Sequence, residues 1–136
     1  MKKFFIILLM LILSISIYAN KVSWYAKGFE GKLTASGYIY DSSQYTCASN
    51  EYPFGTVLKV TNKENKKSIK VVVIDRGGFE KYGRKLDLSK AAFSKIASLD
   101  KGLVNAKIKV VSQENIFKYK QGSPKFTTKE YKKYLN

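Results

Sequence analysis

The run "VVVI", residues 71–74, is the feature that most constrains the fold of this chain. Four β-branched residues in succession favour a buried, extended strand. The run ends on Asp75, and Arg76, Gly77 and Gly78 follow it directly. A carboxylate in this place is either a turn-forming aspartate at a strand end or a functional group in a cleft. The rest of the sequence has to distinguish the two.

Several other short segments also have the composition of strands and are separated by Gly, Asn, Asp or Pro. The pattern predicts a mainly β protein with strands in residues 21–26, 44–49, 56–62, 68–75 and 106–111. The polar loop between 56–62 and 68–75 predicts a hairpin. A helix is expected over residues 89–99, capped by Ser89 and lying over one end of the sheet. Short strands in a small domain favour a closed or nearly closed barrel.

Residues 1–19 have two lysines, an apolar stretch and a small residue, Ala19, which is the layout of a cleaved signal peptide. A membrane anchor is the alternative, but residues 4–18 fall short of the roughly 20 residues that a span needs. No cysteine lies near Ala19, so the chain is not expected to be a lipoprotein. We expect an exported protein, periplasmic or extracellular, with no stable membrane span after cleavage.

The residue inventory disfavours several classes of enzyme. Cys47 is the only cysteine, so no internal disulfide can form, and the chain has no histidine. A cysteine nucleophile would lack a basic partner, and zinc sites and His-based triads are disfavoured. We therefore expect no metal and no cofactor, and we expect Cys47 to be a small buried residue.

The chain carries a formal net charge of +15, and loss of Lys2 and Lys3 with the signal lowers it to +13. Such a charge favours polyanionic partners. Nucleic acid is disfavoured because an exported protein does not meet it, whereas anionic polymers of the cell envelope fit; simple solubilisation by surface lysines is the other interpretation. Residues 112–136 are interpreted as a basic tail, part of it helical. The sequence leaves the oligomeric state open.

Four fragments in this order resemble one family: "VSWYAKGFEGKLTASG", "YPFGTVLKVTN", "VVVIDRGGF" and "LDLSKAAF". They are similar to the rare lipoprotein A (RlpA) type of double-psi β-barrel, which is related to the expansin and barwin barrels. The resemblance covers residues 21–111. It implies a six-stranded barrel with one or two short helices over residues 20–111, followed by the basic tail.

The resemblance also implies a function. Family members with known activity are lytic transglycosylases that cleave peptidoglycan glycan strands, whereas expansins loosen wall polymers without hydrolysis. Asp75 matches the catalytic aspartate, and Asp87 matches an aspartate that expansin-like members keep. Tyr38 and Ser49 stand where active members have a glutamate and a histidine. We expect an endolytic transglycosylase that leaves 1,6-anhydromuramyl ends; the alternative is a non-catalytic, expansin-like or degenerate peptidoglycan-binding module.

One carboxyl group suffices for this chemistry, because it can protonate the glycosidic oxygen and then take a proton from the muramyl 6-hydroxyl. Asp87 is expected to keep Asp75 protonated through its negative charge, or else to hydrogen-bond the start of the helix. Arg76 is expected to meet a barrel carboxylate or the substrate. Gly77 and Gly78 are expected to permit a sharp turn and leave room for a glycan.

Aromatic and hydroxyl side chains complete the predicted site. Tyr25, Tyr38 and Tyr82 are candidates for a sugar-binding groove, because flat aromatic faces suit sugar rings. Thr34 and Ser36 are expected to position sugar hydroxyls or to hydrogen-bond Asp75; formation of a turn explains both equally well.

Overall fold

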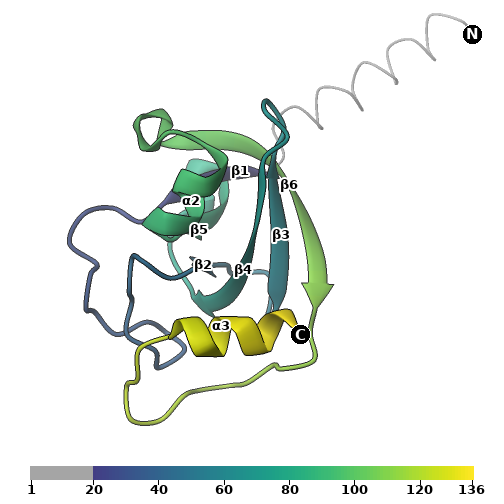
Figure 1. Ribbon diagram of the computed structural model, residues 1–136. Coiled ribbons are helices and arrows are strands. Elements are labelled where there is room, and N and C mark those ends of the chain that lie inside the picture. Colours follow the sequence, from purple (N-terminus) through teal and green to yellow (C-terminus); the bar gives the residue numbers. More distant parts are fainter. Residues whose placement is uncertain (1–19) are drawn as a thin grey trace, which may run out of the picture.

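The computed structural model describes residues 20–136. The predicted signal peptide, residues 1–19, lies outside the described residues. Six strands form a closed barrel in the order β1-β5-β2-β4-β3-β6 (Figure 1). They are β1 (Lys21–Trp24), β2 (Thr46–Ala48), β3 (Val57–Asn62), β4 (Ser68–Asp75), β5 (Arg84–Leu88) and β6 (Leu103–Ser112).

Two α-helices and two 3₁₀ turns accompany the barrel in the described residues. They are α2 (Lys90–Ile96), α3 (Thr128–Leu135), η1 (Glu80–Tyr82) and η2 (Leu99–Lys101). The prediction of a mainly β, six-stranded barrel with one or two short helices is confirmed. Strand β5 is the element that the sequence analysis missed, because none of the predicted strands includes "RKLDL".

Mixed pairing sets which residues face each other across the barrel. Strands β1 and β5 are parallel, as are β2 and β4, and the remaining pairs are antiparallel. Ala48 on β2 is the cross-strand partner of Asp75 on β4 and of Asp87 on β5. Asp87 is in turn the partner of Ser23 on β1. The two aspartates therefore lie in one row, separated by a single small residue.

The main core fills the barrel and includes Val71 and Val73 of β4. Helix α2 adds three buried side chains to it, Ala92, Phe93 and Ile96. The side chain of Ser89 accepts a hydrogen bond from the backbone of Ala92, as expected for the helix cap. A helix is therefore present where it was predicted, but it ends at Ile96 rather than at residue 99: Ala97 and Ser98 are extended, and Leu99 begins the separate turn η2.

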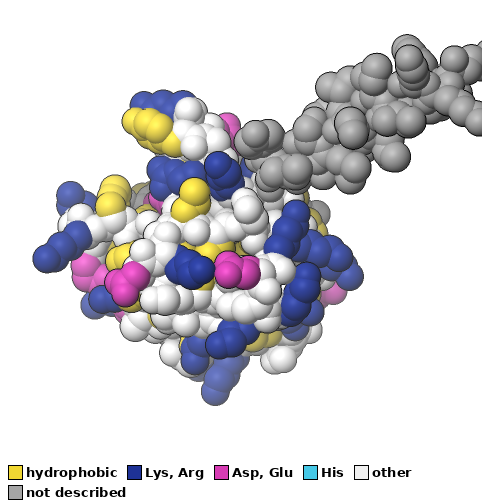
Figure 2. Space-filling model, turned by 90° about the horizontal axis from the view of Figure 1, so that it is seen from above, with side chains coloured by type: hydrophobic (Ala, Val, Ile, Leu, Met, Phe, Trp, Pro, Cys, Tyr) yellow, Lys and Arg dark blue, Asp and Glu magenta, His cyan; other side chains and the backbone are white. Residues whose placement is uncertain are grey.

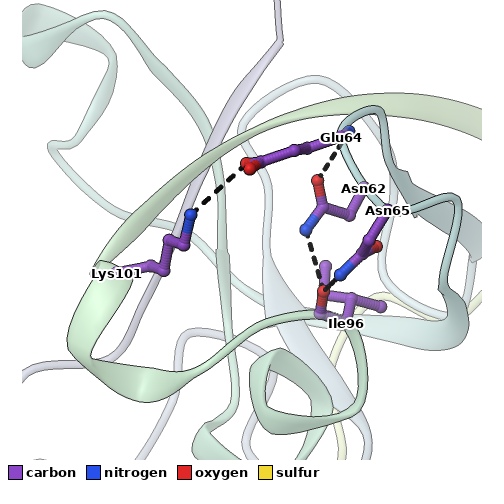
Figure 3. A network of polar contacts seen from close by, with 5 residues as sticks. All are labelled: Asn62, Glu64, Asn65, Ile96 and Lys101. Atoms are coloured by element: carbon purple, nitrogen blue, oxygen red, sulfur yellow. Dashed lines mark hydrogen bonds and ion pairs between the residues drawn. The ribbon is translucent and has the colours of Figure 1, made fainter.

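The loop between β3 and β4 is joined to the end of α2 by side-chain hydrogen bonds (Figure 3). The amide nitrogens of Asn62 and Asn65 both donate to the carbonyl oxygen of Ile96, at 2.8 and 2.9 Å. Lys101 pairs with Glu64 in the same loop at 3.4 Å. Because the last carbonyls of a helix lack partners within the helix, these asparagines hold α2 against the barrel.

The segment interpreted as a basic tail is packed onto the outside of the barrel. Phe126 and Tyr134 are buried in a second core with three residues of the barrel and its loops, Val57, Val72 and Ile74. The two faces of β4 are thus both covered, which explains why its apolar run does not alternate. Residues 112–136 are basic and partly helical, as expected, but they do not extend away from the domain.

Two glycines of the resemblance fragments are where this segment approaches the barrel. A Cβ on Gly37 would lie 2.2 Å from the carbonyl oxygen of Lys120, and one on Gly55 would lie 2.3 Å from that of Asn115. Both glycines have positive φ, 93° in each case. Glycine is therefore required at both places by space and by backbone conformation.

Across residues 20–136, the helices are all too short or too polar to cross a membrane.

Candidate active site

A cleft of about 360 Å³ opens over the row that contains the two aspartates. Its walls come from the ends of β1, β2, β4 and β5 and from the turn after β4. Asp75 and Asp87 both line it, and Ala48 lies between them on the row. The small alanine side chain leaves space above the barrel wall. The structure thus brings together the two carboxylates that the sequence analysis selected.

The half-buried carboxylate of Asp75 is held by three hydrogen-bond donors. Its Oδ1 accepts from the backbone N–H groups of Ala35, at 2.9 Å, and Arg76, at 2.8 Å. Its Oδ2 accepts from the hydroxyl of Tyr25 at 2.7 Å. These contacts fix the orientation of the carboxylate and leave its exposed part toward the cleft. A turn-forming aspartate at a strand end would not need the Tyr25 contact.

Tyr25 forms part of the cleft wall and is almost fully buried. Its ring stacks on Tyr40 with centroids 4.3 Å apart and meets Phe29 edge-on at 5.5 Å. Burial, and next the negative charge of Asp75, raise the pKa of Tyr25 far above its ordinary value. The hydroxyl of Tyr25 therefore stays protonated at any physiological pH and can donate to the Asp75 carboxylate. The prediction that Tyr25 belongs to the groove agrees with this position.

Asp87 is neutralised by its neighbours. The Nη1 of Arg84 lies 3.0 Å from Oδ1 of Asp87 and also donates to the hydroxyl of Ser23 at 2.6 Å. The Ser23 hydroxyl donates to the same Oδ1 of Asp87. Arg84 supplies a compensating positive charge beside Asp87, and the expectation that Asp87 keeps Asp75 protonated through its negative charge stays a prediction. The alternative contact with the helix start is absent from the hydrogen bonds of Asp87 in the described residues.

Arg76 points away from the carboxylate that precedes it. Its guanidinium lies 4.0 Å from the ring centroid of Phe54, and its Nη1 donates to the carbonyl oxygen of Ser49 at 2.7 Å. Burial lowers the pKa of Arg76 from its ordinary value. The expected partner, a barrel carboxylate, is replaced by an aromatic ring and a carbonyl. Arg76 still lines the cleft and can meet a substrate there.

The turn after Asp75 is clamped by Asn50, a residue that the sequence analysis did not select. The side-chain amide of Asn50 donates to the carbonyl of Gly77 at 2.6 Å, and its carbonyl oxygen accepts from the N–H of Gly77 at 3.1 Å. Neither Gly77 nor Gly78 has a positive φ. Gly77 is needed for space instead, because a Cβ there would lie 2.8 Å from the ring of Phe79. Gly78 leaves open space, as predicted.

Tyr82 lies at the rim of the cleft with 68% of its surface exposed. Lys81 lies over its ring at 5.2 Å, and the guanidinium of Arg84 lies 5.8 Å from its centroid. An exposed aromatic ring on a cleft rim is an available platform for a sugar ring. The placement of Tyr82 in the groove agrees with the prediction.

Thr34 and Ser36 are buried and do not line the cleft. Their hydroxyls are 2.9 Å apart, and that of Thr34 donates to the carbonyl of Tyr38 at 2.7 Å. The N–H of Ser36 donates to the carbonyl of Ile74. These bonds form the turn that aims the N–H of Ala35 at Asp75. The prediction of direct contact with Asp75 is wrong, and the interpretation of a turn holds.

Tyr38 and Ser49 do not offer catalytic groups to the cleft. Tyr38 is buried in the second core, and its hydroxyl donates to Glu130 of α3. The prediction of Tyr38 as a groove residue is therefore wrong, because residues 112–136 cover that side of the barrel. The hydroxyl of Ser49 accepts from the N–H groups of Glu51 and Tyr52, within a turn. Ser49 acts on the cleft only through its carbonyl, which holds Arg76.

Cys47 is fully buried, and burial raises its pKa well above the ordinary value. It is therefore unsuited to be a nucleophile. Among residues 20–136, no group of three or more histidine, cysteine or acidic side chains could hold a metal ion. The chemistry available in the cleft consists of one open carboxylate, one neutralised carboxylate and aromatic surface.

Similar solved structures share the barrel. A Streptomyces papain inhibitor is 29% identical, with a TM-score of 0.52 over 66% of this chain and 87% of its own. A mutant Clavibacter michiganensis expansin, solved in complex with cellohexaose, is 20% identical, with a TM-score of 0.53 over 71% of this chain and 50% of its own. The likeness to the expansin concerns the fold.

Relatives with assigned functions are more similar in sequence. An endolytic peptidoglycan transglycosylase RlpA of Vibrio cholerae is 45% identical over 94 residues, which are 69% of this chain and 35% of the relative. Probable enzymes of the same name from Treponema pallidum and Aquifex aeolicus are 42% and 40% identical, over 63% and 65% of this chain. The chain spans 27% and 39% of the lengths of these two relatives.

The model of one protein family, described as lytic transglycolase (DPBB_1), matches residues 17–108. The match covers the barrel up to β6 and includes both aspartates of the cleft. Together with the closed six-stranded barrel, it shows that this chain belongs to the lytic transglycolase family of double-psi β-barrels.

Proposed function

We propose that this protein is an endolytic peptidoglycan transglycosylase that cleaves glycan strands and leaves 1,6-anhydromuramyl ends, with Asp75 as its catalytic residue. The observation that carries the proposal is the carboxylate of Asp75, oriented by three donors and open to a cleft. The names of the relatives from Vibrio cholerae and Treponema pallidum support the same reaction.

The reaction needs one group that first gives and then takes a proton. Protonated Asp75 gives its proton to the glycosidic oxygen, and the bond from that oxygen to C1 of the muramyl residue breaks. The muramyl 6-hydroxyl attacks C1, and the Asp75 carboxylate takes the proton that the hydroxyl loses. No water enters the products, so no second carboxylate is needed as a base for water.

The contacts of Asp75 indicate which oxygen carries the proton. Oδ1 already accepts two backbone N–H groups, which cannot turn away. Oδ2 accepts only the hydroxyl of Tyr25, which can rotate and become an acceptor. In the protonated form that the proposed reaction requires, Oδ2 is therefore the oxygen that can carry the proton.

The other cleft residues bind rather than react. Tyr82 at the rim offers an aromatic face to a sugar ring, and Arg76 offers its remaining donors to sugar oxygens. The ion pair of Arg84 and Asp87 forms a polar part of the cleft wall, on the far side of Ala48 from Asp75. We expect the protein to act outside the cytoplasmic membrane, because peptidoglycan lies there.

A second candidate function is a peptidoglycan-binding module without cleavage. The observation in its favour is that Tyr38 and Ser49 direct their hydroxyls to Glu130 and to a turn. The positions at which the resemblance implies a glutamate and a histidine therefore supply no group to the cleft.

Digestion of purified sacculi separates the two functions. Soluble products are analysed by mass spectrometry for anhydromuramyl ends, and bound protein is measured by co-sedimentation. We expect wild type to release anhydro products and Asp75→Asn to release about 10²- to 10⁴-fold less, because an amide cannot give and retake a proton. Binding to sacculi should be retained in the variant.

The matched control is Asp100→Asn, which makes the same change at an exposed position in η2. It should keep the activity of wild type. A wild type that binds sacculi and releases no anhydro product would establish the binding module. Wild-type activity in Asp75→Asn would remove Asp75 from its proposed role.

A further inference from the structure

Three lysines on the neighbouring strands β4, β3 and β6 form a row on the outer face of the barrel, here called the lysine row. Lys59 on β3 is the cross-strand partner of Lys70 on β4 and of Lys109 on β6. Direct partners point to the same face of a sheet, and all three are exposed. Lys107 lies two residues from Lys109 and shares this outer face.

The lysine row has no counter-charge of its own. The salt bridges of residues 20–136 join Arg84 to Asp87 and Lys101 to Glu64, and neither includes a lysine of the row. Neighbouring strands lie about 4.8 Å apart, so three positive charges stand within about 10 Å. Like charges directly opposite one another destabilise a sheet. The arrangement thus leaves a site that an external anion would complete.

A second basic element lies beside the lysine row. The hydroxyl of Tyr131 on α3 donates to the carbonyl of Lys70 at 2.8 Å, which places the helix next to that end of the row. A shallow hollow of about 470 Å³ on α3 is lined by three lysines and one acidic residue: Lys129, Lys132 and Lys133, with Glu130, beside Asn136. Figure 2 shows lysine and arginine side chains gathered along the right-hand edge of the molecule, the side of β6 in Figure 1. A ligand of the row can therefore continue onto α3.

The type of cation indicates the type of anion. The chain has two arginines, Arg76 and Arg84, and both line the cleft. An arginine fork matches both carboxylate and phosphate oxygens, whereas a lysine ammonium is a point charge with no directional fork that also serves in phosphate sites. A phosphate carries oxygens in several directions and can accept from two ammonium groups at once. A row of point charges therefore suits a chain of phosphate groups, which needs no fork.

We propose that the lysine row binds a linear polyanion with a phosphate backbone, at a site separate from the cleft. Binding rests on charge density and release of counterions, so it does not depend on a fixed lysine geometry. The site requires no cleavage activity.

Inorganic polyphosphate of uniform length is the probe, and fluorescence anisotropy measures its affinity over a series of salt concentrations. In the row variant, Lys59, Lys70 and Lys109 are changed to Gln. We expect the slope of log K against log salt to lose about two to three in magnitude, because each phosphate contact contributes about 0.7 to 0.9. The control variant changes Lys85, Lys95 and Lys118 to Gln, with the same loss of charge at exposed positions outside the row. For this control, the slope of log K against log salt should differ from the wild-type slope by less than about one.

An equal loss in both variants would overturn the proposal, because binding would then follow net charge. Poly-glutamate and single-stranded DNA with matched numbers of charges test the ligand class. Poly-glutamate that binds as tightly as polyphosphate, or DNA that binds more tightly, would also overturn it.

Asp75→Asn should bind polyphosphate like wild type, and the row variant should still release products from sacculi. These readouts separate a failure of this proposal from a failure of the proposed activity. Equal melting temperatures of the two triple variants, or a higher one for the row variant, exclude unfolding as the cause.

Discussion

Strand β4 ends in the cleft at Asp75 and carries the lysine row at Lys70, five residues earlier, so one strand joins two different polar surfaces. In the cleft, both aspartates have fixed partners: three donors hold Asp75, and Arg84 and Ser23 hold Asp87. The lysines of the other row have no ion-pair partner in the described residues. The charged side chains of the cleft thus have fixed positions, whereas the lysine row presents closely spaced positive charges without fixed partners.

The outer face of β4 between the cleft and the lysine row is covered by residues 112–136. Packing of this segment against β4 should therefore stabilise the strand that carries both surfaces. We expect Phe126→Ala to cost about 3–5 kcal/mol of stability, because Phe126 is almost fully buried and its loss leaves a cavity. Urea unfolding measures the change. Ile116→Ala, an exposed position of the same segment, is the control and should cost less than about 1 kcal/mol. A small effect of Phe126→Ala would mean that the segment is dispensable.

The pair of Arg84 and Asp87 should act as one unit in the cleft. Each of Asp87→Asn and Arg84→Gln removes a charge-assisted hydrogen bond, worth about 1.5–3 kcal/mol, and should lower release of anhydro products about ten- to a hundredfold. The double variant should be no worse than the worse single variant, as double-mutant cycles show for coupled groups. Additive losses would indicate that Asp87 acts separately from Arg84, for example on Asp75.

Substitutions that keep the charge should distinguish the two surfaces. Arg76→Lys loses the planar stacking on Phe54, worth about 0.5–2 kcal/mol, and should lower product release by roughly three- to thirtyfold. Lys59→Arg keeps the charge of the lysine row and should leave the affinity for polyphosphate within about twofold. A large loss in Lys59→Arg would show that the row also depends on geometry.

Relief of charge repulsion should give the smallest effect. Lys59→Thr removes the central charge of the lysine row and should raise stability by about 0.2–1 kcal/mol at low salt. The gain should shrink at high salt, because exposed charges are screened. Lys85→Thr is the control, since Lys85 falls at the register shift between β1 and β5 and has no partner there. A loss of stability in Lys59→Thr would contradict the repulsion.

Much of the barrel could be predicted from local pattern. The β-branched run placed β4 and put Asp75 at its end, and Ser89 with its apolar stripe placed α2. Strand β5 was missed although Leu86 and Leu88 alternate with Lys85 and Asp87, which is the signal that could have found it. Asp75, Tyr25 and Tyr82 do line one cleft, but Asp75 was selected from its strand end and the family resemblance and the two tyrosines from their aromatic faces, so no local pattern placed them together.

The alternation of side chains along each strand follows from the local sequence, because side-chain direction in a strand depends only on the local backbone. Which residues lie side by side does not follow from it, since the register of strands far apart in the chain depends on the whole barrel. The row of Asp75, Ala48 and Asp87, the lysine row and the burial of Tyr38 under residues 112–136 all come from such distant contacts. No local pattern of charge or hydropathy contains that information, because these contacts join segments that are separated by tens of residues.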